Sequence, residues 1–267
     1  MNVATESYVP RRGDGSPLCR LSSWPDERRP EAFGEDYLYF YETWLTDEVD
    51  ERQTELVWRL LGVESGAAVL DVACGHGRIA NRLAERGAIV TGLDADPFFL
   101  ARAREAGSGA EYVEGDMREL PFEDASFDGA LLWFTAFGYF DDEGNRAVLR
   151  ELRRVLRTGG RAVIDVQNLP LVLATFQRQS FVRRGADVLL DEHGEFDEKA
   201  RTMETTRTYI RDGAVREVRF RVRCFLPDEL REWLLAAGFE QVDLLGPGGE
   251  PLTPESRRLI AVARAPS

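Results

Sequence analysis

The stretch from Val69 to Ala80, VLDVACGHGRIA, constrains the fold of this chain more than any other. It opens as a short apolar run, breaks at Gly75-His76-Gly77, and then continues with apolar residues at helical spacing. A strand, a glycine turn and a helix in this order form a binding site for a polar or anionic ligand at the helix N-terminus. The glycines permit positive φ and let the backbone touch the ligand. The stretch therefore predicts an α/β fold with a ligand site at this turn.

Two classes of ligand fit the turn. The pattern Gly75-x-Gly77-x-x-Ala80 matches the dinucleotide fingerprint G-x-G-x-x-G/A and would suit an NAD-dependent oxidoreductase. Asp71, near the end of the strand, favours the other class. A carboxylate there is unfavourable beside an anionic pyrophosphate but suits a ligand that carries a positive amino group. A helix cap or turn residue is the alternative interpretation of Asp71.

Composition and charge restrict the partners. The 267 residues are enough for one large α/β domain, or for one domain with an insertion. A net charge of −13 disfavours nucleic acid, whose phosphates require a basic surface. Three widely spaced cysteines, Cys19, Cys74 and Cys224, indicate a reducing compartment without a disulfide framework. Because no apolar run has membrane-spanning length and no signal-peptide core opens the chain, we expect a cytoplasmic protein, monomeric or homodimeric.

The second predicted strand, 89–93, ends in Asp94, about 20 residues beyond Gly75. An acid at this separation can accept hydrogen bonds from both ribose hydroxyls of a nucleoside. Asp96, followed by Pro97, has the pattern of a helix N-cap. We therefore expect Asp94 to be free for a ligand while Asp96 has a structural role.

A third strand, 111–114, is followed by Asp116 and Met117. An acid can accept from the exocyclic amino group of adenine, and an apolar side chain can pack on its ring; an ordinary strand-to-loop turn is the alternative. Because the carboxyl ends of parallel strands gather at one edge of a sheet, an acid at the end of three successive strands favours a shared ligand site.

Aromatic residues concentrate in two places. The fourth strand, 127–133, runs directly into FTAFGYF, 134–140, a loop that is predicted to wall an acceptor substrate or to pack under the next helix. Before the first strand, Tyr37 and Tyr41 recur at helical spacing. They are expected either to pack in the core or to reach the ligand with their hydroxyls.

The chain divides into four parts. We expect a flexible segment over 1–30, a ligand-binding core with an N-terminal helical cap over 31–170, an antiparallel β insertion over 171–225, and a helix and strands that complete the core over 226–267. The insertion is predicted from the two-residue alternation of Val218, Phe220 and Val222 with arginines, and from the Asp212-Gly213 hairpin signal. It is expected to pack over the carboxyl edge of the main sheet as a lid on the acceptor side.

The motifs VLDVACGHG, GLDAD, YVEGDM, FDGALLW and LRRVLRTGG, in this order and spacing, resemble the class I, seven-stranded, Rossmann-like S-adenosylmethionine-dependent methyltransferases of the bacterial small-molecule and natural-product type. The resemblance covers 37–166 and 227–263. It implies a doubly wound, mostly parallel seven-stranded sheet, S-adenosylmethionine as methyl donor with S-adenosylhomocysteine as product, and a small-molecule acceptor methylated at nitrogen, oxygen or activated carbon. One departure is Thr158, where the family usually has proline before the Gly-Gly turn.

The residues expected at the site follow from the motifs and the resemblance together. Those expected to bind the cofactor are Tyr37, Tyr41, Asp71, Ala73, Gly75, Gly77, Asp94, Ala95, Asp116, Met117 and Trp133. Those expected to contact the acceptor are Phe134, Phe137, Tyr139 and Asn168, while Asp165 and Gln167 are either acceptor ligands or structural. His193 is the candidate base, against a surface turn as the alternative, and His76 is expected to be structural. No cluster has metal-ligand spacing, so we expect no metal. A cofactor-binding partner protein without activity remains a further alternative.

Overall fold

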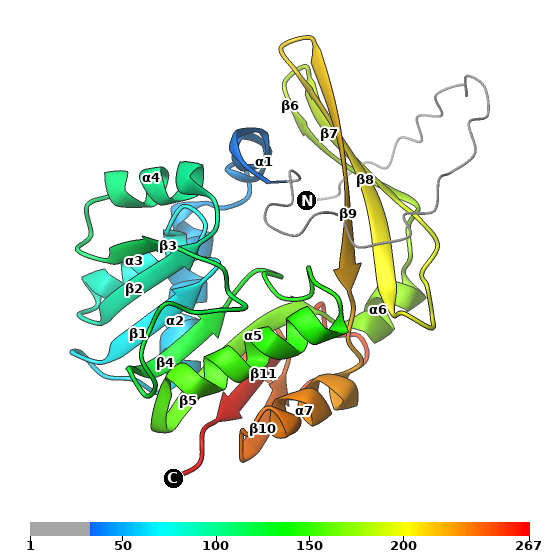
Figure 1. Cartoon of the computed structure of the whole chain (residues 1–267). Coiled ribbons are helices and arrows are strands. Elements are labelled where there is room, and N and C mark those ends of the chain that lie inside the picture. The colour runs from blue at the N-terminus through cyan, green and yellow to red at the C-terminus, as the bar shows by residue number, and fades with distance from the viewer. Residues whose placement is uncertain (1–32) are drawn as a thin grey trace.

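The computed structural model describes residues 33–267, which form two β-sheets (Figure 1). The main sheet has the strand order β10-β11-β5-β4-β1-β2-β3. Its strands are β1 Ala68–Val72, β2 Ile89–Asp94, β3 Glu111–Glu114, β4 Phe127–Leu132, β5 Leu156–Gln167, β10 Gln241–Leu245 and β11 Arg258–Arg264. β11 runs in the opposite direction to the other six strands of this sheet. The predicted fold class, a mostly parallel seven-stranded sheet with a separate antiparallel sheet, is confirmed; the expectation for 1–30 lies outside the described residues.

Helices cover both faces of the main sheet. They are α2 Asp47–Leu61, α3 Arg78–Glu85, α4 Pro97–Glu105, α5 Asp142–Val155 and α7 Pro227–Ala236. Alternate residues of a strand point to opposite faces. Val69 of β1 therefore packs with α2 and α3, whereas Leu70 packs with α5 and α7. Burial on both faces explains why β1 and β4 are mainly apolar in the sequence, with Asp71 and Asp128 as their charged residues.

The order of the strands places the switch point at β1. From β1 the chain moves outward through β2 and β3, then returns to the other side of β1 with β4 and β5. All five strands are parallel, so their carboxyl ends lie at one edge. In open α/β sheets, ligands bind at this edge beside the switch point. The glycine turn follows β1 directly.

The second sheet is an antiparallel meander of β6 Gln179–Arg184, β7 Asp187–His193, β8 Thr202–Arg211 and β9 Ala214–Arg223, reached through the short helix α6 Leu169–Ala174. Asp212 and Gly213, with φ of 51° and 78°, link β8 to β9, which confirms the predicted hairpin. β7 ends at His193 and β8 starts only at Thr202, so a loop and not a tight hairpin follows His193. The sequence analysis did not predict α6, although Asn168 at its N-cap and Pro170 in its first turn are typical of a helix start.

The first helix, α1 Glu35–Tyr41, packs on this second sheet (Figure 1). Phe40 is fully buried against Leu189 and Tyr209 of the sheet. Asp36 pairs with Arg211 at 3.1 Å, and the Tyr39 hydroxyl donates to Asp187 at 2.7 Å. The helix and the sheet are therefore one packed unit. The unit contacts the carboxyl edge of the main sheet, since the N–H of Arg223 at the end of β9 donates to the carbonyl of Gly138.

Within 33–267, every helix is too short or too polar to cross a lipid bilayer.

Candidate functional site

The turn after β1 leaves open space beside Gly75. Gly75 and Gly77 have φ of 56° and 76°, and Ala73, which does carry a Cβ, also has a φ of 56°. A Cβ on Gly77 would lie 2.4 Å from the Tyr112 hydroxyl oxygen, so this glycine is required for packing. A Cβ on Gly75 would meet nothing within 4 Å. Gly75 therefore presents bare backbone to a ligand, and the strained Ala73 shapes the same turn.

Asp94, at the end of β2, holds the turn in place. Its Oδ2 accepts from the Gly75 N–H at 2.8 Å, and its Oδ1 accepts from the Asp96 N–H at 2.9 Å. The expectation that Asp94 is free of structural duty is therefore wrong. Each oxygen retains a second lone-pair direction, which is enough for one ligand hydroxyl each. Asp96 caps α4 by accepting from the Phe98 N–H at 2.9 Å, as predicted.

Asp71 lies in the adjacent strand with only 3% of its surface exposed. Burial raises the pKa of Asp71 to about 7; the nearby charge of Arg78 opposes this rise and the charge of Asp94 adds to it. A positive ligand group beside Asp71 would replace the lost solvation and favour the carboxylate. The site is therefore suited to an ammonium group.

Asp116, beyond the end of β3, is already paired. The Arg118 Nη2 donates to its Oδ2 at 2.7 Å, and the Arg118 guanidinium lies 4.4 Å from the centre of the Phe140 ring. An adenine amino group at this position must share Asp116 with Arg118. Met117 is half-buried against the core on the side of α5.

Aromatic rings gather where α1 and the second sheet meet the loop after β4. Tyr37 stacks on Tyr41 at 4.2 Å between ring centres, and Tyr41 meets the edge of Phe134 at 6.2 Å. Phe33 contacts both Tyr37 and Tyr139, at 5.0 and 5.4 Å. The structure thus brings together Tyr37, Tyr41, Phe134 and Tyr139, which lie far apart in the sequence. Burial raises the pKa of Tyr37 and of Tyr139, so these phenols remain neutral hydrogen-bond donors near pH 7.

A buried ion pair lies next to these rings on the second sheet. Arg207 Nε donates to Asp191 Oδ1 at 2.7 Å, and both side chains are less than 10% exposed. The Arg207 guanidinium lies 5.1 Å from the ring centre of Phe220 and 5.7 Å from that of Tyr37. This part of the second sheet therefore carries aromatic rings beside a buried ion pair whose two charges cancel.

The loop after β4 is strained and anchored. Phe134 and Thr135 have φ of 62° and 63°, a left-handed conformation that is costly for side chains with a Cβ. The Phe134 N–H donates to Asp165 Oδ2 at 3.0 Å, and the Thr135 N–H donates to the Asp165 carbonyl at 3.0 Å. Arg258 of β11 binds both carboxylate oxygens of Asp165 at 2.7 Å and also donates to Thr135 Oγ1 at 2.7 Å. This Asp165–Arg258 pair fixes the backbone that carries the Phe134 ring, which lies against Tyr41.

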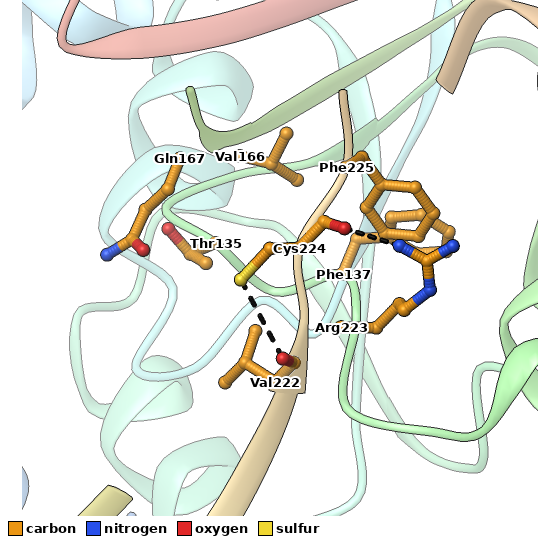
Figure 2. Close-up of a pocket in the computed structure, with 8 residues that line it drawn as sticks. All are labelled: Thr135, Phe137, Val166, Gln167, Val222, Arg223, Cys224 and Phe225. Carbon is orange, nitrogen blue, oxygen red and sulfur yellow. Dashed lines mark hydrogen bonds between the residues drawn. The ribbon is translucent and has the colours of Figure 1, made fainter. Parts of the chain in front are cut away.

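A small cavity marks the joint between the two sheets. Figure 2 shows its lining, which comes from the loop after β4, the end of β5 and the end of β9: Thr135, Phe137, Val166, Gln167, Val222, Arg223, Cys224 and Phe225. It has room for about one water molecule. The cavity is thus too small for a substrate, and burial raises the pKa of its Cys224 thiol to about 11.

The comparisons with known proteins identify the family of this chain. A family model described as "Methyltransferase domain" matches residues 69–160, from β1 to the turn within β5. The demethylmenaquinone methyltransferase of Clavibacter sepedonicus is 33% identical over 190 residues, which cover 69% of this chain and 70% of that protein. The chain belongs to the class I S-adenosylmethionine-dependent methyltransferase family.

Three further matches are shorter or more distant. The demethylmenaquinone methyltransferase of Thermotoga maritima is 43% identical, but the match spans only 36% of this chain and 42% of that protein. Among solved structures, the CcbJ methyltransferase of Streptomyces caelestis has a TM-score of 0.73 at 23% identity, covering 86% of this chain and 96% of that one. CalS10 of Micromonospora echinaspora, an amino pentose methyltransferase solved with its cofactor bound, has a TM-score of 0.64 at 23% identity, covering 87% and 97%. These two structures support the fold.

Several expected contacts of this methyltransferase are not brought to the site. Phe137 is 1% exposed and stacks on Phe225 at 5.1 Å, so it is a core residue beneath the loop and not an acceptor contact. Asn168 is fully buried, and its amide donates to the carbonyls of Thr253, Pro254 and Ser256. Its role is to anchor the loop between β10 and β11. The sequence places Phe137 and Asn168 just after two strands, but it does not show which distant segments cover them in the folded protein.

Three other predicted residues, Trp133, Ala95 and His193, lie outside the aromatic cluster and the three acids. Trp133 is buried on the side of α2, where its indole N–H donates to Gln53 Oε1 at 3.1 Å. Ala95 is exposed beside Asp94. His193 ends β7 with its ring between the hydroxyls of Ser180 and Thr205, at 3.4 and 3.1 Å. It shares the face of Asp191 and Arg207, since alternate residues of a strand point the same way.

The sequence analysis missed Arg78 and Arg258. Arg78 is the first residue of α3, directly after Gly77, and its position next to the turn was the available signal. Arg258 gave no local signal, because its partner Asp165 lies on a strand that pairs with it only in the folded sheet.

Burial lowers the pKa of His76 to about 4, so this imidazole is neutral near pH 7. Within 33–267, no group of three His, Cys, Asp or Glu side chains is placed to hold a metal ion.

The protonation state of Asp71 predicts how the affinity for the cofactor depends on pH. An ammonium group binds the carboxylate form, whose pKa in the free protein is about 7, so affinity for S-adenosylhomocysteine should rise with pH and level off above about 7. Below about pH 7 we expect this affinity to fall by up to about tenfold per pH unit. Titration calorimetry between about pH 5.5 and 8 would measure it. Asp71→Asn should bind more weakly and without this slope; equal slopes in the two proteins would contradict the assignment.

Proposed function

We propose that this chain transfers a methyl group from S-adenosylmethionine to a small-molecule acceptor held between the carboxyl edge of the main sheet and the inner face of β6–β9. The observation that carries the proposal is the set of three acids, Asp71, Asp94 and Asp116, on the ends of neighbouring strands around the bare backbone of Gly75. Their spacing along the sheet suits an ammonium group, two ribose hydroxyls and an adenine amino group, in that order.

The site residues act by binding and orientation. Bound there, the cofactor would supply an electrophilic methyl group on a sulfonium, which is transferred by in-line displacement. Asp94 would accept the ribose hydroxyls and Asp71 the ammonium group, while Tyr37 and Tyr41 close the site from α1. Correct alignment of donor and acceptor can supply roughly 7–11 kcal/mol of the rate enhancement. For an acceptor that must lose a proton, His193 is the candidate base, and burial lowers its pKa and keeps it neutral near pH 7.

The alternative of an NAD-dependent oxidoreductase is disfavoured by the same geometry. A pyrophosphate at the N-terminus of α3 would lie beside the carboxylate of Asp71. Because Asp71 is buried, repulsion between these two anions would be strong. Titration calorimetry with S-adenosylhomocysteine and, separately, with NAD tests this choice. We expect micromolar binding of the first and none of the second. Binding of NAD alone would overturn the proposal. Cofactor binding without methyl transfer to any of a panel of amines, phenols and quinols would favour an inactive partner protein.

Tyr139 and Phe137 separate an acceptor contact from a core contact. Tyr139 belongs to the ring cluster formed with Phe33, Tyr37, Tyr41 and Phe134. Phe137, two residues earlier, is buried and stacks on Phe225. Tyr139→Ala is expected to raise the Michaelis constant for the acceptor by about tenfold or more with little change in melting temperature. Phe137→Ala should instead destabilise the fold by about 3–5 kcal/mol. The measurements are acceptor kinetics and thermal melts, and the reverse pattern would place the acceptor elsewhere.

A further inference from the structure

Three tyrosines of the aromatic cluster bring their hydroxyl groups close together. They are Tyr37, Tyr41 and Tyr139, and each remains partly exposed although its ring packs on another ring. Burial raises the pKa of Tyr37 most, and the neighbouring Tyr41 and Tyr139 raise it further, so the three hydroxyls are neighbours. Within 33–267, the hydroxyls of Tyr37 and Tyr139 have no hydrogen-bond partner. Polar groups in this state beside a ligand site are available to a ligand.

These hydroxyls are hydrogen-bond donors. Burial raises the pKa of Tyr37, Tyr41 and Tyr139, so each phenol keeps its proton near pH 7. At Tyr41, the charge of Arg207 and a hydrogen bond from it oppose this rise. Because a guanidinium can only donate, it occupies a lone pair of the Tyr41 oxygen and leaves the Tyr41 proton for another acceptor. The cluster therefore offers three O–H groups to one ligand.

The second sheet places a positive charge next to the hydroxyls. The Arg207 guanidinium lies 5.7 Å and 5.9 Å from the ring centres of Tyr37 and Tyr41. Its partner Asp191 binds Nε and Nη2 at 2.7 Å each. Burial has the largest effect on the pKa of Tyr41 and of Tyr139, and the charge of Arg207 then has a larger effect than that of Asp191. The guanidinium is therefore the nearer of the two charges.

Two further guanidinium groups approach from the side of the main sheet. They belong to Arg78 of α3 and Arg258 of β11, and each opposes the effect of burial on the pKa of one tyrosine of the cluster. Their acids, Asp50 and Asp165, are bound to them at 2.9 Å and 2.7 Å. His193, on the same face of the second sheet as Arg207, is neutral near pH 7 because burial lowers its pKa. The charges that face the hydroxyls therefore favour an anion.

We propose that the hydroxyls of Tyr37, Tyr41 and Tyr139, together with the charge of Arg207, bind the methyl acceptor as an oxyanion. O–H donors and positive charges are the surroundings that an oxyanion requires, whereas the same charges repel an ammonium group. The aromatic rings beside the hydroxyls suit a flat molecule. The acceptor class is therefore a flat molecule with an acidic hydroxyl group, such as a phenol or an enol. The inference rests on the proposed function and adds the substrate class to it.

The site also promotes loss of the proton from the acceptor. Stabilisation of the ionised form lowers the pKa of the acceptor hydroxyl, and its proton passes to solvent or to His193 before the transfer. The oxyanion then forms a bond to the methyl carbon, while the electron pair of the carbon–sulfur bond stays on sulfur. The positive sulfur and the oxyanion both lose their charge, and the products are a thioether and a methyl ether.

The test uses two probes of the same size, 4-nitrophenol and 4-nitroaniline, with protein saturated by S-adenosylhomocysteine. The ionised form of 4-nitrophenol absorbs visible light, so a spectrophotometric titration gives the pKa of the bound probe. We expect the protein to bind the ionised form about tenfold or more tightly than the neutral form, which lowers this pKa by about one unit or more. The amine 4-nitroaniline should bind more weakly than ionised 4-nitrophenol.

Three kinds of variant identify the groups that bind the oxyanion. Tyr139→Phe removes one donor and should weaken binding of the ionised probe by about 10- to 100-fold, the value of one charge-assisted hydrogen bond, with little effect on 4-nitroaniline. Arg207→Met should reduce the preference for the ionised form, and Arg207→Lys should retain more of it. Tyr39→Phe is the matched control: it lies on the same helix as Tyr37, but its hydroxyl donates to Asp187 at 2.7 Å, so neither affinity should change.

Removal of Arg207 leaves the buried Asp191 without its partner, so the fold is checked by thermal melts. If Arg207→Met does not fold, Asp191→Asn/Arg207→Met takes its place and should show the same loss. Tighter binding of 4-nitroaniline, an unchanged or raised pKa of bound 4-nitrophenol, or equal effects of Tyr139→Phe and Tyr39→Phe would overturn the oxyanion site. Failure of both probes to bind a protein that binds S-adenosylhomocysteine would do so as well. A protein that does not bind S-adenosylhomocysteine would instead contradict the proposed function.

Discussion

Replacement of Asp94 by alanine should weaken binding of S-adenosylhomocysteine by about 10²- to 10⁴-fold. The variant loses two charge-assisted hydrogen bonds to the ribose, each worth about 1.5–3 kcal/mol. It also loses the acceptors for the N–H groups of Gly75 and Asp96, so the turn is no longer held at the ligand. Titration calorimetry measures the affinity, and circular dichroism confirms that the sheet is intact.

The matched control for Asp94 is two residues away. Asp96→Ala removes the cap of α4 and should cost about 1 kcal/mol of stability with less than a twofold change in affinity. Asp94→Asn keeps the size of the side chain and one acceptor oxygen, so its affinity should lie between those of wild type and Asp94→Ala. Wild-type affinity in a well-folded Asp94→Ala protein would mean that the ribose lies elsewhere.

Replacement of Arg258 by methionine should destabilise the protein by about 3–5 kcal/mol, because Asp165 would be left as a buried charge without its partner. For a chain of this size the expected fall in melting temperature is about 10 °C. The strained backbone of Phe134 and Thr135 would lose one of its anchors, so affinity for S-adenosylhomocysteine should fall as well. Chemical denaturation and calorimetry measure the two effects.

Two further variants identify the cause. Arg264→Met lies on the same strand, but its ion pair with Glu240 is 3.9 Å long and largely exposed, so we expect a change of less than about 0.5 kcal/mol. The double variant Asp165→Asn/Arg258→Met removes the unpaired charge and keeps an acceptor for the Phe134 N–H. It should recover part of the stability. A double variant no more stable than Arg258→Met would show that the buried charge is not the cause.

The sequence predicted the parts of the site that depend on local pattern. Each acid that ends a strand could be recognised because an apolar run, a polar break and a new periodic run are local signals. This is why the sequence places Asp71, Asp94 and Asp116 at the ends of three strands, and why the order of the first five strands of the main sheet and of the helices between them agrees with the prediction. The cap at Asp96 and the hairpin at Asp212-Gly213 are equally local, and both are present.

Local pattern was insufficient wherever a residue's role depends on a distant partner. Phe137 and Tyr139 belong to one aromatic loop, yet one packs in the core and the other joins the ring cluster, because different elements cover them. Asn168 ends a strand as the acids do, but the loop before β11 closes over it. Asp94 was assigned to a ligand alone, because its hydrogen bond to the Gly75 N–H exists only once β1 and β2 are paired.

The amino-acid sequence by itself determined the fold class and the family, and it predicted an acid at or near the end of each of three neighbouring strands, because these features follow from the residue pattern of single segments. The tertiary structure alone decided how that site is held. It joined α1 to the second sheet, and it brought Arg258 to Asp165 and Asp50 to Arg78, across long separations in the chain. Hydrogen bonds and ion pairs act over a few ångströms, so a pair from distant segments is defined only when the sheet and its helices have packed.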